Sequence, residues 1–446
     1  MKSFNKSLTY PKITAVSFAL LILAGTGLLM LPISSKTSSA SFVDALFTAT
    51  SAGCITGLVP FDTFTQWSVF GQIVIISLIQ IGGLGFVTIL SGIVRMLGQK
   101  MSLKQKMMLK ESIGSLTLGD ATELVKSVVV FTLLCEAAGA ALLSIRFVPL
   151  AGLRRGVYMA IFTSVSAYCN AGFDLMGQYS PSSSLTTING DWVVLLTISM
   201  LIIFGGLGFI VWEDMRYCKF RPSAFSVHTK LTLITTAALL LGSTALFLFF
   251  ENGNTLSDMG IGKKLLNAFF SSVTPRTAGF NSVDVGAMTP LSKMLTIILM
   301  FIGGSTGSTA GGIKTTTVAV IVLCVVSNMR DKDDVNVFGR RITLDTIKKS
   351  ISVIATNLFL IFIATVIVSN VQPEASLIDV IFECTSAIGT VGMTAGITTS
   401  LCVAAKIVII LLMYVGRLTS LIFALSFVQT KPKTNSHKPR GYIMVG

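Results

Sequence analysis

The chain has 446 residues, of which 52% are apolar and only 12% are charged. About 25% of the residues of an ordinary soluble protein are charged, so this composition excludes a water-soluble globule. The seven cysteines form no CxxC pair, which argues against a disulfide scaffold. We therefore expect an all-α polytopic membrane protein.

The formal net charge is +14, and the positions of the basic residues indicate its role. Of the 34 lysines and arginines, 23 fall in five segments that are every second connection between apolar runs: 1–12, 95–126, 213–230, 328–349 and 429–446. This alternation is the positive-inside pattern of membrane proteins, so nucleic acid is not needed as a partner. It predicts a multi-pass protein of the cell membrane with both termini in the cytoplasm and an even number of spans.

Eight long apolar runs follow in chain order and satisfy that parity: 13–33, 66–97, 127–149, 191–212, 230–250, 291–327, 351–371 and 402–428. The first run follows three lysines, as the core of a signal peptide does. Its length of about 20 residues is that of a span, so we expect it to be retained.

Each pair of runs encloses a shorter, half-polar stretch that ends in a similar phrase. The phrases are TSAGCITG at 50–57, VSAYCNAG at 165–172, SVTPRTAG at 272–279 and TSAIGTVG at 385–392, at intervals of 115, 107 and 113 residues. Such even spacing indicates a fourfold internal repeat. The predicted divisions are repeat 1 at 1–97 with a pore loop at 42–57, repeat 2 at 98–215 with one at 155–172, repeat 3 at 216–328 with one at 262–279, repeat 4 at 329–428 with one at 376–392, and a cytoplasmic tail at 429–446.

Each phrase follows about ten residues of helical pattern, too few to cross a bilayer that needs about 20. We therefore expect four repeats of span, pore half-helix, loop and span, which makes eight spans around one central pore. Irregular backbone at membrane depth is tolerated where it is packed in protein or lines water. Rings of loop carbonyls can replace the hydration shell of a monovalent cation, and the negative C-terminal ends of the half-helices favour a cation as well.

Further motifs point to one family. Thr390, Val391 and Gly392 repeat the first three residues of the potassium-channel phrase TVGYG. GGLGF occurs at 82–86 and again at 205–209, TPRTAGF occurs at 274–280, and Gly416 precedes Arg417 in the last run. On these residues the whole chain resembles the membrane subunit of the Ktr/Trk superfamily of potassium transporters, most closely the Ktr type. The resemblance implies potassium uptake through a channel-like pore.

By this resemblance, potassium binds along a selectivity filter made of the last three residues of each phrase, and at no other metal site. The filter residues are Ile55, Thr56, Gly57, Asn170, Ala171, Gly172, Thr277, Ala278, Gly279, Thr390, Val391 and Gly392. Because the four triplets share only the glycine, a less selective filter and a role of sodium stay open. A competing interpretation is that the glycines only end buried half-helices as C-caps. Cys54 and Cys169 occupy equivalent positions and are interpreted as small packing residues rather than as metal ligands.

The sixth apolar run, 291–327, is too long for one span, since a helix of that length would measure about 55 Å against a hydrocarbon core of about 30 Å. Its interruption is the segment GGSTGSTAGGIKT at 303–315. The segment resembles a phosphate-binding loop, but an isoleucine precedes its lysine and no strand precedes it, so we reject nucleotide binding. By the resemblance it is an intramembrane gate loop at 303–314 that includes Gly303, Gly304, Gly307, Gly311, Gly312 and Lys314. The competing interpretation is close helix packing through glycines four residues apart.

Two arginines are expected at membrane depth, where an unpaired charge is costly. The resemblance implies that Arg417 contacts the gate loop, while Glu136 is an alternative partner and snorkelling to the interface is a third interpretation. We expect Arg276, next to the third filter triplet, to point behind its loop toward a carboxylate.

The sequence predicts a transporter and no enzyme, because the motifs of intramembrane proteases are absent. No cofactor is expected beyond the transported potassium ion. The alternative is a secondary transporter of another cation or of a polar solute, although such folds usually consist of two related halves. By the resemblance, the partners are a second copy of the chain in a homodimer and a cytosolic ring of nucleotide-binding regulatory subunits. The basic connections are equally explained by contact with anionic membrane lipid.

Overall fold

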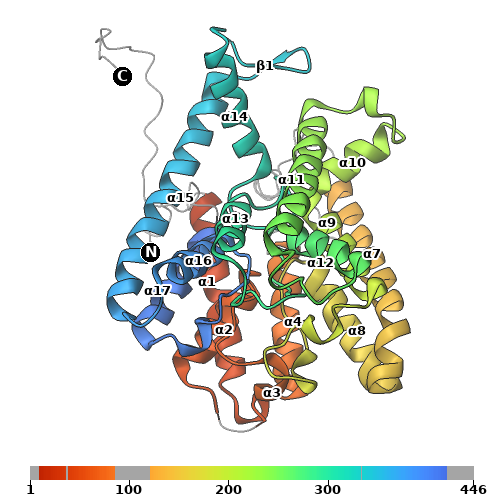
Figure 1. Cartoon of the computed structure of the whole chain (residues 1–446), viewed down its shortest axis with the longest axis vertical. Helices are drawn as coiled ribbons and strands as arrows, with labels where there is room; N and C mark the ends of the chain where they lie inside the picture. The colour runs from red at the N-terminus through yellow and green to blue at the C-terminus, as the bar shows by residue number, and fades with distance from the viewer. Residues whose placement is uncertain (1–9, 37–38, 86–120, 333, 419–446) are drawn as a thin grey trace, which may run out of the picture.

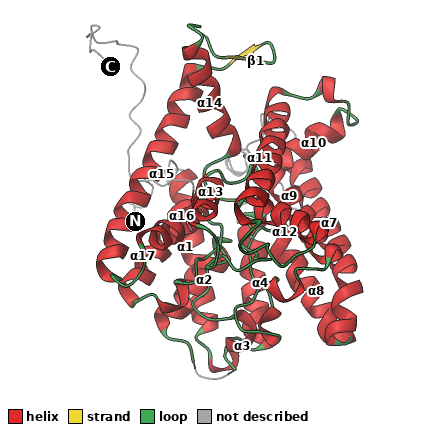
Figure 2. Cartoon of the chain, in the orientation of Figure 1, coloured by secondary structure: helices red, strands yellow, loops and turns green. Residues whose placement is uncertain are grey.

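The computed structural model describes residues 10–36, 39–85, 121–332 and 334–418. The second half of the run 66–97, the connection that follows it and the tail 429–446 lie outside the described residues. Most of the described part is helical, with loops between the helices and one short hairpin (Figure 2).

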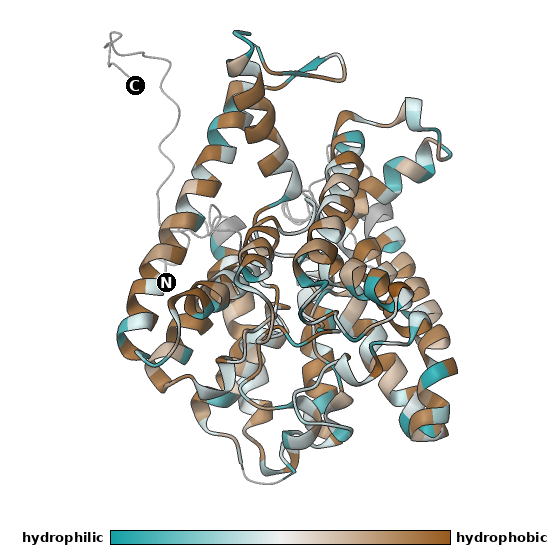
Figure 3. Ribbon diagram, in the orientation of Figure 1, coloured by the Kyte–Doolittle hydropathy of each residue, from teal (hydrophilic) through white to brown (hydrophobic). Residues whose placement is uncertain are grey.

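Four long helices carry the strongest apolar signal. They are α1 (Tyr10–Leu29), α7 (Ala121–Ala151), α11 (Val227–Glu251) and α15 (Leu344–Val371). Within the described residues, these four helices are long and apolar enough to cross a membrane, and a fifth is added if one bent pair counts as a single span. Their surfaces are rich in exposed apolar side chains, such as Leu241 at 71% and Phe362 at 67% exposure. Figure 3 shows this apolar character along the length of the molecule, which is what lipid contact requires.

Four short helices follow the long ones and correspond to the predicted half-helices. They are α2 (Phe42–Gly53), α8 (Leu153–Tyr168), α12 (Ile261–Val273) and α16 (Leu377–Gly389). Two of them begin with a serine N-cap. The hydroxyl of Ser41 accepts a hydrogen bond from the backbone N–H of Asp44, and the hydroxyl of Ser376 accepts one from the backbone N–H of Asp379. The C-terminal halves of all four are buried, so the four loops start in the interior.

A second set of shorter apolar helices comes after the loops. It consists of α4 (Val69–Leu84), α9 (Trp192–Leu207), α13 (Pro290–Phe301) and α17 (Val403–Arg417). The sequence suggests one straight helix over 191–212, but the structure bends it by 87° into α10 (Phe209–Tyr217). The bend falls at Gly208, whose φ of 97° lies in a region that glycine tolerates best. The run 291–327 is divided into α13 and α14 (Thr315–Met329), with an irregular segment between them.

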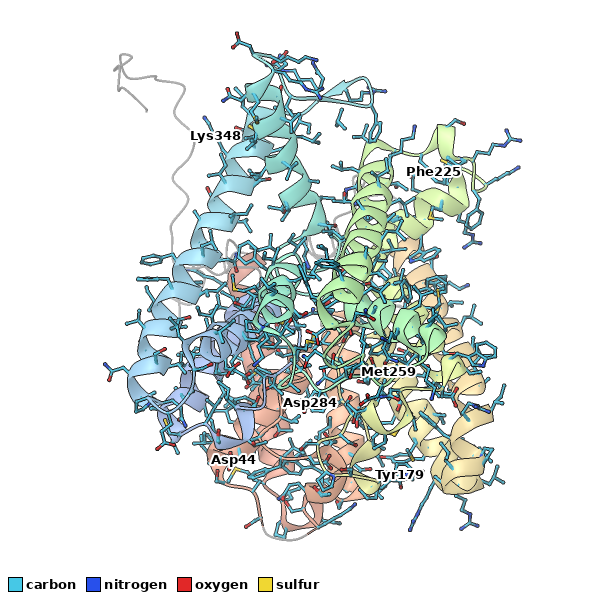
Figure 4. All side chains as sticks on the ribbon, in the orientation of Figure 1. Asp44, Tyr179, Phe225, Met259, Asp284 and Lys348 are labelled. Atoms are coloured by element: carbon cyan, nitrogen blue, oxygen red, sulfur yellow. The ribbon has the colours of Figure 1, made fainter. Side chains whose placement is uncertain are left out.

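The remaining elements are short. They are α3 (Thr63–Gln66), the 3₁₀ turns η1 (Pro32–Ser34), η2 (Met176–Gln178), η3 (Thr186–Ile188), η4 (Pro222–Ala224) and η5 (Thr398–Ser400), and an antiparallel hairpin of β1 (Asn336–Val337) and β2 (Arg340–Arg341). In Figure 1 the hairpin and the ends of α14 and α15 project at the top, and α3 lies at the bottom. Figure 4 marks the same two ends, with Lys348 and Phe225 near the top and Asp44 and Tyr179 near the bottom.

Two ion pairs join short helices to helices of the second set. Lys293 of α13 lies 2.9 Å from Asp379 of α16, and Lys406 of α17 lies 2.7 Å from Asp44 of α2. Both lysines and both aspartates are less than one-fifth exposed. The aspartates occupy equivalent positions in their short helices, three residues after the N-cap serine, so the pairs connect α13 to α16 and α17 to α2 in a similar way.

Candidate functional site

The four loops share one backbone conformation. The glycine that ends each phrase has a positive φ, at 95° for Gly57, 72° for Gly172, 82° for Gly279 and 90° for Gly392. The residue two places earlier is left-handed in every loop as well, with φ of 56° at Ile55, 59° at Asn170, 71° at Thr277 and 49° at Thr390. A positive φ is uncommon in residues other than glycine. Its recurrence at equivalent places means that the four loops turn in the same way.

The loops meet one another in a closed order. A Cβ atom added to Gly57 would lie 2.5 Å from the carbonyl oxygen of Ala171, and one added to Gly172 would lie 2.6 Å from that of Ala278. One added to Gly279 would lie 2.5 Å from that of Val391, and one added to Gly392 would clash with that of Thr56. The loops therefore contact in the order one, two, three, four and back to one. This contact brings the twelve predicted filter residues together.

The four loops that contact in this closed order form a ring, and each loop glycine lies next to a backbone carbonyl oxygen of the following loop. Within the described residues, no hydrogen bond is donated to the carbonyl oxygens of Thr56, Ala171, Ala278 or Val391. Two backbone N–H groups of the loops, by contrast, donate to serine hydroxyls of the short helices. The N–H of Gly57 donates to Ser51 at 2.9 Å, and the N–H of Gly392 donates to Ser386 at 3.1 Å. An uncompensated buried carbonyl is costly, so this geometry suits a dehydrated cation.

The second set of helices supports the loops through glycines. A Cβ atom on Gly82, Gly205 or Gly416 would overlap the carbonyl oxygen of Gly53, Tyr168 or Ile388, respectively. Those three carbonyls occupy the same position of the phrase, in the last turn of each short helix. The glycines of the GGLGF phrases and Gly416 thus permit the close approach of a neighbouring helix to three of the four loops.

A cavity of about 450 Å³ opens on one side of the ring. All four ring glycines line it, together with three carboxylate residues, Asp62, Asp174 and Asp284, and several hydroxyl residues. In Figure 4, Asp284 lies in the lower half of the molecule, among the loops. No lysine or arginine occurs among the lining residues, which all belong to the described part of the chain. Such a vestibule attracts cations to the ring.

The pKa of Asp174 is raised from 3.8 to about 6. Burial of the carboxyl group is the main cause, and the nearby charge of Asp62 raises the pKa further, against a hydrogen bond from the backbone N–H of Met176. Sequence reasoning missed these acidic residues, although Asp174 follows the second phrase by two positions.

The irregular segment between α13 and α14 lies against the other side of the ring. A Cβ atom on Gly311 would overlap the hydroxyl of Thr390, and one on Gly303 would lie 3.3 Å from the side chain of Thr277. One on Gly312 would lie 2.9 Å from the carbonyl oxygen of Gly389. The predicted gate residues are therefore next to the predicted filter residues.

Gly304 and Gly307 connect this segment to its neighbours. The backbone N–H of Thr315 donates to the carbonyl of Gly304 at 3.0 Å, which closes the segment at its base. The N–H of Phe209 donates to the carbonyl of Gly307 at 2.7 Å, and this bond joins the segment to α10.

Two cations hold the carbonyls of the same segment. Arg417 donates through Nη1 to the carbonyl of Thr309 at 2.7 Å and through Nη2 to that of Gly82 at 2.5 Å. Lys314 donates to the carbonyls of Ala310 at 2.7 Å and Gly311 at 3.2 Å. Arg417 thus contacts the segment at 303–314, as the resemblance implies.

The alternative partner of Arg417 is engaged elsewhere. Glu136 is 6% exposed and accepts a hydrogen bond from the side-chain amide of Gln80 at 3.2 Å, and its other oxygen lies 3.9 Å from the thiol of Cys169. Cys54 and Cys169 follow the last turns of α2 and α8 and are fully buried, as packing residues would be.

The expectation for Arg276 is not met. This residue is 5% exposed and donates to the hydroxyl of Thr236 on α11 at 3.3 Å, and no carboxylate pairs with it in the described part of the chain. The reason is that α11 presents threonine side chains, not acidic ones, to the third loop.

Comparisons with known proteins agree with this geometry. The family model described as TrkH, cation transport protein, matches residues 5–438. The Ktr system potassium uptake protein B of Bacillus subtilis is 42% identical over 98% of this chain and 97% of its own. The potassium/sodium uptake protein NtpJ of Enterococcus hirae is 39% identical over 100% and 99% of the two chains.

The same fold occurs in a solved structure. The crystal structure of the potassium transporter TrkH from Vibrio parahaemolyticus has a TM-score of 0.74 at 18% identity, covering 96% of this chain and 86% of that one. Since the family model matches nearly the whole sequence, the chain belongs to the TrkH family of cation transport proteins.

Proposed function

We propose that this protein takes up potassium across the cell membrane through a channel-like pore. The observation that carries the proposal is the closed contact order of the four loops, whose carbonyl oxygens at Thr56, Ala171, Ala278 and Val391 receive no hydrogen bond from the described residues. Rings of such carbonyls replace the hydration shell of potassium. The twelve residues of the four triplets are the ion-binding residues in this proposal.

The proposed architecture has eight spans in four repeats of span, half-helix, loop and span. Four long helices, four short ones with buried ends and the shared loop conformation support it. With both termini in the cytoplasm, the end that carries the hairpin is cytoplasmic and the acidic vestibule is external. The predicted repeat boundaries remain part of the proposal.

The segment at 303–314 is the proposed gate. It lies against the inner side of the filter, and Lys314 and Arg417 place two positive charges where an ion would leave. Conduction therefore requires the segment to move. The five glycines of the segment allow such movement.

The proposed partners are a second copy of the chain and a cytosolic ring of regulatory subunits, as in the Ktr type. No cofactor takes part, because transport of this kind involves no covalent chemistry. Sodium is a second candidate ion, since the relative from Enterococcus hirae is named for potassium and sodium uptake and the glycine is the one residue common to all four triplets.

Rubidium flux into vesicles that contain the purified protein tests the proposal, because rubidium substitutes for potassium. We expect flux that unlabelled potassium inhibits, with measurements repeated with and without sodium. Protein that is folded but carries no rubidium under any of these conditions would contradict the proposal.

A further inference from the structure

A groove of about 330 Å³ lies between α7 and α10, away from the filter. Its α7 wall includes Val130, Phe131 and Leu134, and its α10 wall includes Phe209 and Trp212. Val130 is 46% and Leu134 63% exposed, so the groove opens at the lipid-facing surface.

The floor of the groove is rigid. The ring of Trp212 lies 5.2 Å from that of Phe131 and 5.1 Å from that of Phe204, measured between centroids. The indole N–H of Trp212 donates to the carbonyl of Phe204 at 3.0 Å. Since these contacts fix the side chain, an apolar ligand meets a preformed surface and loses little affinity to ordering.

The helix α10 has the geometry of an interfacial helix. It leaves α9 at 87°, so it runs along the membrane plane if α9 crosses it. Tyr217 is 88% and Phe220 62% exposed at its end, as in the aromatic belts of membrane proteins.

Basic residues predominate in the lining of the groove and among its neighbours in the sequence. Arg216 lines it, Lys219 and Arg221 follow α10, and Lys126 precedes the lining residue Ser127 on α7, all four with exposed side chains. Two acidic residues oppose these four charges: Glu213 lines the groove, and Asp214 accepts a hydrogen bond from the backbone N–H of Ser226 at 3.0 Å. An apolar slot with a net positive charge in and next to its lining fits an anionic phospholipid, with its acyl chain along Phe131 and its headgroup at Arg216.

The groove is also joined to the proposed gate. Phe209 lines the groove, and its backbone N–H donates to the carbonyl of Gly307 at 2.7 Å. A Cβ atom on the preceding Gly208 would lie 2.6 Å from the carbonyl of Thr306, so α10 and the gate segment are in contact at this point. A ligand that fixes α10 therefore stabilises the gate in the position seen here.

From this geometry we infer that the groove between α7 and α10 binds an anionic phospholipid, and that the bound lipid favours the closed gate. The second part rests on the proposed function, whereas the first does not. The contribution of one basic residue near an anionic headgroup is about 1 kcal/mol, which corresponds to roughly fivefold in lipid affinity.

Trp212 provides a direct test of binding. The chain has three tryptophans, and Trp67 is 1% exposed while Trp192 is 64% exposed. The Trp192→Phe variant leaves Trp212 as the tryptophan that lipid reaches, with Trp67 as a constant background. The full-length variant is placed in vesicles that mix phosphatidylcholine and phosphatidylglycerol, with bromine on the chains of one or the other, and the fluorescence quenching is measured.

We expect brominated phosphatidylglycerol to bind next to Trp212, as measured by quenching of its fluorescence, with roughly fivefold higher affinity than brominated phosphatidylcholine. Arg216→Gln should bring the ratio close to one, whereas Arg154→Gln, an exposed basic residue at the start of α8, should leave it unchanged. The matched control is Trp212→Phe, in which Trp192 reports ordinary lipid and both probes should quench equally. Equal quenching at Trp212, quenching unaffected by Arg216→Gln, or no quenching because protein covers the groove would each overturn the lipid site.

Rubidium flux tests the link to the gate. In the absence of a regulatory partner, flux should be severalfold lower in vesicles with phosphatidylglycerol than in phosphatidylcholine alone, and Arg216→Gln should abolish this difference. Equal flux in both lipids, with selective quenching intact, would overturn the link. Because quenching needs no conduction, a protein that transports no rubidium would contradict the proposed function and still report on the lipid site.

Discussion

Arg417 and Thr309 lie 108 residues apart in sequence and are joined by a hydrogen bond of 2.7 Å from Nη1 of the arginine to the carbonyl oxygen of the threonine. The second arm of the same guanidinium reaches Gly82 at 2.5 Å. One side chain of α17 therefore connects the segment between α13 and α14 to α4. Hydrogen bonds that involve a charged group contribute about 1.5–3 kcal/mol each, which is enough to hold the proposed gate in a closed state.

Arg417→Gln should weaken that closed state, because glutamine keeps a polar group but loses the charge and the two-armed fork. We expect partner-free rubidium flux to rise roughly tenfold, the factor that corresponds to about 1.4 kcal/mol. Arg417→Lys keeps the charge but loses the planar fork that reaches two distant carbonyls, so its flux should fall between the other two. Flux equal to that of the parent in both variants would mean that Arg417 has a structural role only.

Gly311→Ala should displace the gate segment. The added methyl group would overlap the hydroxyl of Thr390, so either the segment or the filter residue must move. We expect higher basal flux if the segment yields. Gly242→Ala on α11 is the control, since an added Cβ atom meets nothing within 4 Å there. A folded Gly311→Ala protein with lower flux than the parent would favour the interpretation of these glycines as packing residues.

The vestibule predicts a dependence of uptake on external pH. With its pKa raised to about 6, Asp174 is charged above that pH and neutral below it, so acidification removes one negative charge near the filter. Uptake at low potassium should fall as the external pH drops through about 6, and Asp174→Asn should have lower uptake at pH 7.5 and lose this step. An unchanged pH profile in the variant would assign the step to another group.

The same raised pKa has a consequence for folding. The protonated form of Asp174 is favoured in the folded state, so its contribution to stability is fully present below its ordinary pKa of 3.8 and is lost as the pH rises through about 6. Asp174→Asn should therefore be at least as stable as the parent at neutral pH in thermal unfolding. Marked destabilisation at pH 7.5 would contradict this sign.

The ion pair between Asp44 and Lys406 should contribute to stability. Both side chains are 13% exposed, so Asp44→Asn leaves a largely buried lysine without its counter-ion. Loss of one partner of a buried pair lowers the free energy of unfolding by about 3–5 kcal/mol. Because this pair is partly exposed, we expect a decrease of roughly 2–4 kcal/mol. The matched control is Asp334→Asn, which removes an exposed pair with Arg341 worth about 0–1 kcal/mol. Equal shifts of the unfolding temperature in the two variants would refute the prediction.

Much of this molecule follows from its sequence. The phrase register brings Gly57, Gly172, Gly279 and Gly392 to equivalent positions, and the structure gives them the same backbone conformation. These equivalent positions can be predicted because each phrase forms its short helix and glycine turn from residues that are close together in the sequence. The break in the run 291–327 is likewise predictable, because the run is longer than one span and its glycines are concentrated in one segment.

Other features depend on contacts between distant segments. The bend at Gly208 cannot be read from an apolar run, and it places the backbone N–H of Phe209 against the carbonyl of Gly307, about 100 residues further along the chain. The partner of Arg276 was predicted wrongly within the described residues, since charge pairing is the usual rule for a buried arginine and the neighbouring helix offers Thr236 instead. Asp62, Asp174 and Asp284 belong to three different loops. No pattern in the sequence therefore indicates that they line the same cavity.

The central claim is that four loop glycines allow a ring of carbonyls to select potassium, and Gly392 tests it most directly. Its φ is 90°, and an added Cβ atom would clash with the carbonyl of Thr56 and lie 2.8 Å from the Cα atom of Gly57. The measurement is the ratio of rubidium to sodium flux into vesicles that contain equal amounts of folded parent, Gly392→Ser and the control Gly242→Ser. The account predicts that Gly392→Ser lowers the ratio at least tenfold or abolishes rubidium flux, while Gly242→Ser matches the parent. A Gly392→Ser protein with the parent's ratio and rate would contradict the account.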